Sequence, residues 1–251
     1  MPKLGQTNDQ MDTHSIGGTT FQFSAAKIGT LGASEYTLAT IVVDGSGSVD
    51  PFWNEIKAAL KENVAACADP KNPRADNLML RVLVFDSQLT EVHGFKPVRD
   101  INPADYDSLP IPGGMTALYD ATFNGVQASV QYAKALAAQQ YTCNGAIFVI
   151  TDGMDNASKV SRKMVADALK DTKSSESMES MMPVLIGVNT ASGGLNQYLE
   201  DFKNEAGFQQ YVALADATKA KLMKLGGFIS ASISSQSKSL GSGAGSRSLS
   251  F

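Results

Sequence analysis

Three oxygen-bearing side chains, those of Asp44, Ser46 and Ser48, fall on one short stretch of the chain. The stretch follows an apolar run, 38–43, that predicts a buried strand, and it precedes a helix start at 50–51. It is therefore expected at the carboxyl end of a strand, where open α/β sheets bind ligands. Carboxylate and hydroxyl oxygens suit a hard cation such as magnesium, manganese or calcium. Three such ligands do not complete an octahedral shell, so a metal site here needs further ligands from elsewhere in the chain or from water.

Two other segments are expected to bring oxygen donors to the same edge. Asp152 follows the apolar run 146–150, and Thr116 follows Gly113 and Gly114 just before a predicted helix. Parallel strands joined by right-handed crossovers have their carboxyl ends along one edge of the sheet, so these segments should converge. Carboxylates that are crowded together repel one another, and a divalent cation removes that repulsion.

The elements that position these residues alternate between strand-like and helix-like patterns from Leu38 onward. Apolar runs at 38–43, 78–85 and 146–150 are typical of strands buried on both faces. The segments between them carry apolar residues at helical spacing. The predicted fold class is α/β, with a doubly wound, mainly parallel central sheet and helices on both faces.

The pattern also predicts boundaries. Residues 1–19 are expected to form a polar arm, 20–235 one domain, and 236–251 a tail rich in Ser and Gly. Within the domain, 20–24 and 89–93 are expected as edge strands. A long loop at 94–114, which holds four prolines, is expected to be functional because such loops are uncommon in compact domains.

Composition bounds the function further. With 251 residues, 43% of them apolar, the chain is large enough for a sizeable core, and a net charge of −4 gives no sign of nucleic-acid binding. No apolar run reaches the ~18 to 20 residues of a membrane span. The polar N-terminus lacks the core of a signal peptide, so a cytoplasmic protein is expected. Cys67 and Cys143 match no zinc or redox spacing and are expected to be buried free thiols.

The set Asp44-x-Ser46-x-Ser48, Thr116 and Asp152 resembles the metal-ion-dependent adhesion site of von Willebrand factor type A domains. The flanking residues are similar to that family as well, in the required order and context, at 41–44, 114–118 and 149–153. The resemblance covers roughly 21–235. It is closest in style to stand-alone intracellular bacterial members, some of which serve stress response and tellurite resistance.

The resemblance implies a single divalent cation, Mg²⁺ before Mn²⁺ or Ca²⁺. In the family, Ser46, Ser48 and often Thr116 contact the metal directly, while Asp44 and Asp152 commonly act through hydrogen bonds or water. One coordination position stays open for a Glu or Asp of a partner protein. Further residues are expected behind the ligands or around the rim of the site, namely Gly45, Gly114, Asp120, Gly153 and Asp155.

Each of these side chains also has a purely structural interpretation. Asp44, Ser46 and Ser48 suit a turn, and Thr116 suits a helix cap. Asp155 suits a turn acid, although the three segments in order favour the metal site.

Two other functions remain open beside a metal-dependent protein-binding module. One is a structural subunit of a larger assembly, in which the metal only stabilises the fold. The other is a metal-dependent hydrolase. Against it, position 46 is Ser where phosphoryl-transfer enzymes need a second acid, no histidine lies near a serine motif, and no phosphate-binding glycine motif is present. We therefore expect a protein that is not an enzyme.

Overall fold

Eight strands form one sheet in the computed structural model, which describes residues 10–17, 19–191, 193–241 and 249–251. The strand order is β1-β2-β5-β4-β3-β6-β7-β8, and every neighbouring pair is parallel except β1–β2 and β4–β5. The strands are β1 (Met11–Ser15), β2 (Gln22–Ala26), β3 (Glu35–Asp44), β4 (Leu78–Phe85), β5 (Leu89–Pro97), β6 (Thr142–Thr151), β7 (Met181–Gly187) and β8 (Gln210–Ala213).

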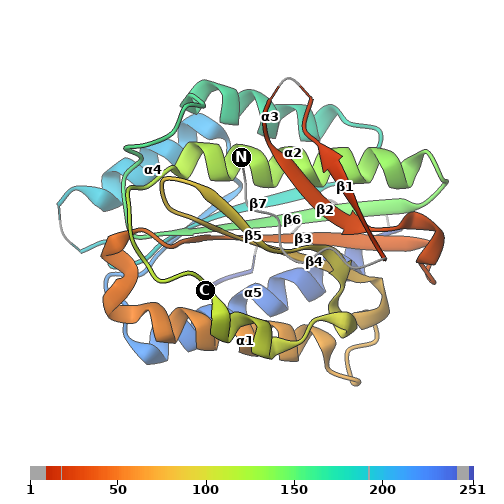
Figure 1. Cartoon of the computed structure of the whole chain (residues 1–251), viewed down its shortest axis with the longest axis horizontal. Coiled ribbons are helices and arrows are strands. Elements are labelled where there is room, and N and C mark those ends of the chain that lie inside the picture. Colours follow the sequence, from red (N-terminus) through yellow and green to blue (C-terminus); the bar gives the residue numbers. More distant parts are fainter. Residues whose placement is uncertain (1–9, 18, 192, 242–248) are drawn as a thin grey trace.

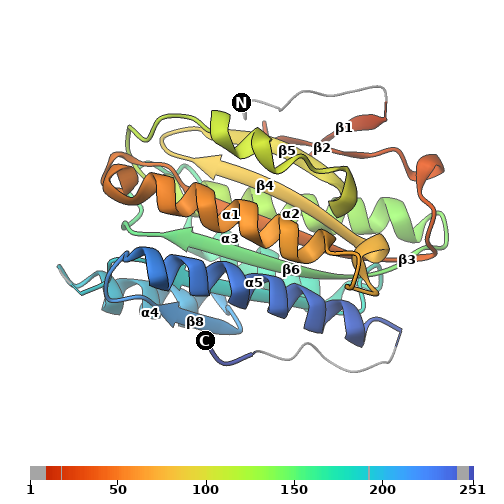
Figure 2. The same cartoon turned by 90° about the horizontal axis from the view of Figure 1, so that it is seen from below.

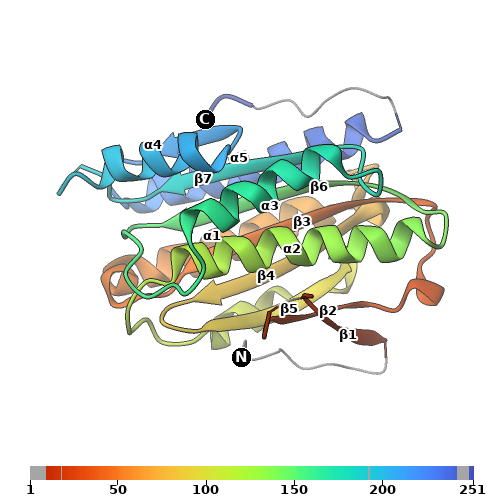
Figure 3. The same ribbon diagram turned by 90° about the horizontal axis from the view of Figure 1, so that it is seen from above.

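Helices cover both faces of this sheet (Figure 1). Three of them lie over one face, as the view from above shows (Figure 3): α2 (Leu118–Ala137), α3 (Arg162–Ser174) and α4 (Leu195–Ala206). The opposite face carries α1 (Trp53–Ala68) and α5 (Lys219–Ser239), which lie side by side (Figure 2). Each face of the sheet thus has its own apolar core. The predicted doubly wound α/β fold is confirmed.

The central strand β3 determines where the polar stretch after it lies. All its residues but the first are buried, because β4 and β6 flank it and helices cover both faces. The parallel register pairs Asp44 with Phe85 and Val43 with Ile150. The chains that leave β3 and β6 therefore emerge next to each other at one end of the sheet.

The N-terminal region is more ordered than expected. Instead of a loose arm, 11–15 forms β1, which pairs with β2, while residues 1–9 lie outside the described part. Neither β2 nor β5 is an edge strand, because β2 lies between β1 and β5, and β5 lies between β2 and β4. The polar residue types that suggested an edge are paired inside the core, where the buried Glu91 carboxylate accepts hydrogen bonds from the Ser24 amide and the Arg81 guanidinium.

The proline-containing segment 94–114 also differs from a structureless loop. Its first four residues belong to β5, and short 3₁₀ helices follow at Val98–Asp100 and Pro103–Ser108. Tyr106 is buried there, and its hydroxyl lies 2.7 Å from Nε2 of the buried His93. Only the last residues of the segment, up to Gly114, reach the carboxyl end of the sheet.

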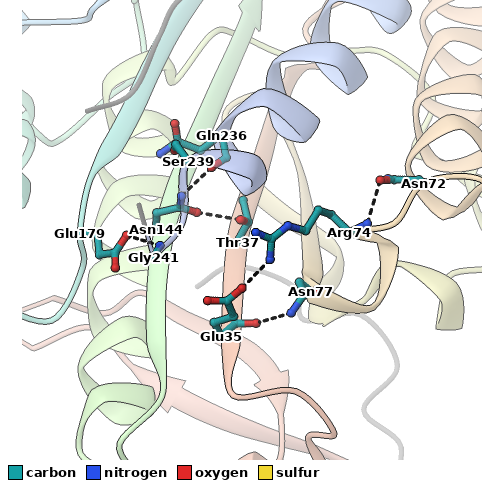
Figure 4. Close-up of polar contacts among 10 residues, drawn as sticks. All are labelled: Glu35, Thr37, Asn72, Arg74, Asn77, Asn144, Glu179, Gln236, Ser239 and Gly241. Atoms are coloured by element: carbon teal, nitrogen blue, oxygen red, sulfur yellow. Dashed lines mark hydrogen bonds and ion pairs between the residues drawn. The ribbon is translucent and has the colours of Figure 1, made fainter. Parts of the chain in front are cut away.

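The last helix continues beyond the expected boundary at 235. It ends at Ser239. Gln236 holds this extra turn against the sheet, because its buried side chain donates hydrogen bonds to the Gly145 carbonyl and the Ser180 hydroxyl. Asn144 joins the same network at the amino ends of the strands (Figure 4), donating to the Gln236 carbonyl. Most of the predicted tail, 242–248, lies outside the described residues. Leu249 and Phe251 pack against the core on the α1 and α5 side, where the Phe251 ring contacts Phe228 of α5.

Both cysteines are buried free thiols, as expected. Cys67 belongs to the core between the sheet and α1, and Cys143 to the core on the other face. Burial raises the pKa of each thiol to about 12. Among the described residues, no helix has the length and apolar character needed to cross a membrane.

Candidate metal centre

The five residues expected to bind a metal lie at the carboxyl end of the sheet, on the left in Figure 1. Asp44 is the last residue of β3, and Ser46 and Ser48 belong to the turn that leads into α1. Thr116 lies just before α2, and Asp152 follows β6 directly. Three segments far apart in the sequence thus supply the donors.

Asp44 organises the turn that follows it. The residue is 1% exposed, its Oδ1 accepts a hydrogen bond of 2.9 Å from the Ser46 amide, and its Oδ2 accepts one of 2.6 Å from the Thr151 hydroxyl. Burial raises the pKa of Asp44, and these hydrogen bonds partly oppose the rise. Both oxygens have protein donors, so Asp44 fixes the positions of its neighbours.

The hydroxyls of Ser46 and Ser48 and the carboxylate of Asp152 form a continuous chain of oxygens. The two hydroxyl oxygens are 3.1 Å apart, and the Ser48 hydroxyl donates to Asp152 Oδ1 at 2.7 Å. These separations are those of ordinary hydrogen bonds, so the oxygens already lie close together. Their types, carboxylate and hydroxyl, fit a small, hard divalent cation.

Asp152 has the most informative electrostatics of the set. Burial raises its pKa to about 6, and the negative charge of Asp44 adds to the rise, while the hydrogen bond from Ser48 opposes it. The two carboxylates are thus close enough for the charge of Asp44 to raise the pKa of Asp152. A bound cation would favour the ionised form of both.

Thr116 is buried at the same end of the sheet, outside this chain of oxygens. Its backbone is fixed by Asn156. The side-chain oxygen of Asn156 accepts a hydrogen bond from the Thr116 amide at 2.8 Å, and the backbone amide of Asn156 donates one to the Thr116 carbonyl at 3.0 Å. A Cβ atom on Gly153 would lie 3.2 Å from the Thr116 hydroxyl and 3.8 Å from Asp44 Oδ2. A side chain at Gly153 would crowd the Thr116 hydroxyl, so glycine lets the loop after β6 pass close to Thr116.

The other two glycines expected around the site join its loops. A Cβ atom on Gly45 would lie 2.7 Å from Val84 Cγ1, so the turn runs close against β4. Gly114 has a φ of +74°, a conformation that favours glycine. The Gly113 amide donates to the Gly45 carbonyl at 2.9 Å, which fastens the loop before Thr116 to the Asp44 turn.

Asp120 and Asp155, which were expected around the site, hold backbone amides. Asp120 accepts hydrogen bonds from the amides of Lys159 at 3.0 Å and Val160 at 2.7 Å. Asp155 accepts one from the Tyr119 amide in the first turn of α2 at 3.2 Å, and so satisfies a donor that the helix itself leaves free. Both acids therefore fasten the loop after β6, which carries Asp152, to the start of α2.

Three supporting residues had no role in the sequence interpretation. Thr151 donates to Asp44, and its place beside Asp152 at the strand end could have indicated this. Asn156 fixes the Thr116 backbone. The Tyr198 hydroxyl on α4 accepts a hydrogen bond from the Asp155 amide at 3.1 Å. Because these two residues are far apart in the sequence, no sequence pattern indicated the contact.

No group of three or more His, Cys, Asp or Glu side chains suited to a metal occurs in the described part of the chain. The centre described above has a different composition, with two carboxylates and three hydroxyls.

Comparison with known proteins identifies the fold. No family model and no curated protein matches the chain. Three solved structures cover about four fifths of it: the PilB minor pilin from Streptococcus sanguinis (TM-score 0.55, 16% identity, 80% of this chain), the pilus adhesin SpaC from Lactobacillus rhamnosus GG (0.54, 12%, 83%), and proximal thread matrix protein 1 from the mussel byssus (0.51, 18%, 81%).

This chain shares its mainly parallel α/β fold with these three structures, and the fold is consistent with the von Willebrand factor type A kind expected from the sequence. At these sequence identities the likeness concerns the fold alone. The chain spans 62% of the pilin, 31% of the adhesin and 47% of the thread protein.

Proposed function

We propose that this protein is a metal-ion-dependent protein-binding module. Asp44, Ser46, Ser48, Thr116 and Asp152 would hold one divalent cation at the carboxyl end of the sheet. The observation that carries the proposal is the chain of oxygens from Ser46 through Ser48 to Asp152, with separations of 3.1 Å and 2.7 Å. Solved structures of the same fold whose names describe a pilin and a pilus adhesin support a binding role over an enzymatic one.

Magnesium is the cation that the donor set favours. Mg²⁺ keeps several waters and is bound through one or two carboxylates, which matches a centre that offers two carboxylates beside hydroxyl groups. Hydroxyl and carboxylate donors suit Mg²⁺ and Mn²⁺ alike. When bound, the cation would supply a positive charge that attracts an external carboxylate.

The partner would be a protein that presents a Glu or Asp. Ser48 is exposed and Asp152 partly exposed, so the centre faces solvent on the side away from Asp44. The protein donors leave room in the shell of an octahedral ion, and a partner carboxylate would displace water there. Without the cation, Asp44 and Asp152 would repel the same carboxylate, so binding should require metal.

We further propose that the module acts in the cytoplasm, where thiols such as Cys67 and Cys143 stay reduced. On the basis of the resemblance given above, we also propose a role in bacterial stress response, as part of a complex of several proteins. The identity of the partner captured from lysate tests this role.

The test compares Ser48→Ala with Ser108→Ala. Both serines are exposed, but Ser108 donates its hydroxyl hydrogen bond within its own turn, to the Asp105 carbonyl. Magnesium binding is measured by calorimetry, and proteins captured from native lysate are compared in magnesium and in chelator. The proposal predicts that Ser48→Ala alone loses both metal and metal-dependent partner. If metal binds but a specific partner is retained in chelator, the metal is structural and the assembly-subunit alternative holds. If wild type binds no metal, the proposal fails.

A further inference from the structure

Large apolar side chains are exposed at few positions in the described chain, and most of these positions are near the metal centre. The exposed fractions are 88% for Ile111, 54% for Met115, 38% for Met154 and 42% for Met164. The first three belong to loops that carry or adjoin the proposed ligands. We refer to Ile111, Met115 and Met154 as the apolar rim.

Backbone hydrogen bonds place the rim around the centre. Met115 precedes Thr116, and Met154 lies two residues after Asp152. Their loops run together, since Asn156 is bonded to both the amide and the carbonyl of Thr116. Ile111 lies on the same loop as Met115, two residues before Gly113, whose amide donates to the Gly45 carbonyl.

The rim is held in place by the fold. Ile111 stands between two prolines, and the Met115 amide donates to the Ser87 hydroxyl at 2.9 Å. Because the backbone at Ile111 and Met115 is held, a ligand that covers these side chains does not have to order that loop as well. Methionine side chains are adaptable enough to pack against apolar groups of different shape. Apolar side chains gathered at a polar site are a feature of binding surfaces.

We propose that the partner of this site is a segment in which an Asp or Glu is flanked by large apolar side chains. This inference rests on the proposed function and adds the chemistry of the residues beside the acid. The acid would meet the cation at the centre, and its neighbours would cover the apolar rim. A basic segment would be repelled by the bound ion, and a wholly apolar segment would leave the open coordination position to water.

The experiment uses three short fluorescent peptides and the full chain. One peptide has a central Asp with Leu on both sides, the second has the same Asp with Ser on both sides, and the third has Asn with Leu. Anisotropy gives their affinities in magnesium and in chelator. The variants are Ile111→Ser, Met115→Ser and Met154→Ser, with Met164→Ser as control because Met164 is exposed on α3 and outside the ligand loops. Calorimetry gives the magnesium affinity of each variant without peptide.

In magnesium, the Asp peptide with Leu should bind about tenfold more tightly than the one with Ser, because it buries further apolar surface. Each rim variant should reduce that ratio by about threefold or more, with magnesium affinity unchanged, and Met164→Ser should leave the ratio intact. If both Asp peptides bind equally in magnesium, or the rim variants behave like Met164→Ser, this inference is overturned and the proposed function stands. If no Asp peptide binds in a metal-dependent manner, or the Asn peptide binds as well, both are overturned.

Discussion

Acidification should release the metal from this centre at an unusually high pH for a carboxylate site. The perturbation is a change from about pH 7.5 to about pH 5, and the responsible group is Asp152. Its pKa is raised to about 6 from 3.8, first by burial and then by the charge of Asp44. Metal binding needs the ionised form, because a cation and a proton compete for the same oxygens.

The magnitude follows from that pKa. With a value of about 6, roughly 97% of Asp152 is ionised at pH 7.5 and roughly 9% at pH 5, so the affinity should fall about tenfold. With the ordinary value, about 94% would remain ionised at pH 5 and the affinity would hardly change. Asp44, whose pKa is also raised, can only steepen the loss.

In the metal-free protein, acidification should instead increase the stability of the fold. The folded form binds the Asp152 proton more tightly than the unfolded form does, so the contribution of this group to stability is greatest below about pH 4. That contribution is lost as the pH rises through about 6. Acid thus removes the stabilisation by metal while it relieves the repulsion between the two carboxylates.

The assay is calorimetric titration with magnesium at several pH values, using wild type, Asp152→Asn and, as control, Asp167→Asn on the exposed side of α3. Asp152→Asn should bind more weakly at pH 7.5 and show a smaller dependence on pH, whereas Asp167→Asn should follow wild type. The reasoning is refuted if wild-type affinity is the same at pH 7.5 and pH 5, or if Asp152→Asn keeps the full dependence.

Three further outcomes are expected. Magnesium at a hundredfold excess over its dissociation constant should add about 2.7 kcal/mol to the free energy of unfolding, and an identical melting temperature in chelator would contradict metal binding. Thr116→Ala should weaken partner binding more than it lowers the melting temperature; the reverse result would make Thr116 a structural residue. Tyr198→Phe removes the acceptor of the Asp155 amide and should weaken magnesium binding about threefold to tenfold. The control Tyr211→Phe loses only a hydrogen bond to Asn196 and should leave magnesium binding unchanged. Equal effects of the two variants would exclude a role for Tyr198 in positioning the loop.

Partner specificity should be separable from metal affinity in the same protein. The rim residues and the ligand residues lie on the same loops, yet the rim side chains point their apolar groups to solvent while Asp44 is buried. Substitutions at the rim should therefore change which peptide binds, and substitutions at the ligands should change whether any peptide binds.

The sequence by itself determined the strands at the centre of the fold and the ends at which the donors lie. A continuous apolar run needs burial on both faces, so 38–43 and 146–150 could only be central strands, and Asp44 and Asp152 had to lie where those strands end. Local patterns failed where polar residues were paired inside the core. Arg81 and Glu91 are fully buried as an ion pair, which no local pattern reveals, and so β5 was wrongly assigned to the edge of the sheet.

Only the tertiary structure decided how the donors are joined. The bond from Ser48 to Asp152 spans 104 residues, and it depends on the parallel register of β3 and β6. The roles of Asp120 and Asp155 likewise depend on where the start of α2 meets the loop after β6. Strand ends are set by hydrophobic burial along the chain, whereas the partner of each polar atom is set by the packing of segments that the chain brings together from far apart.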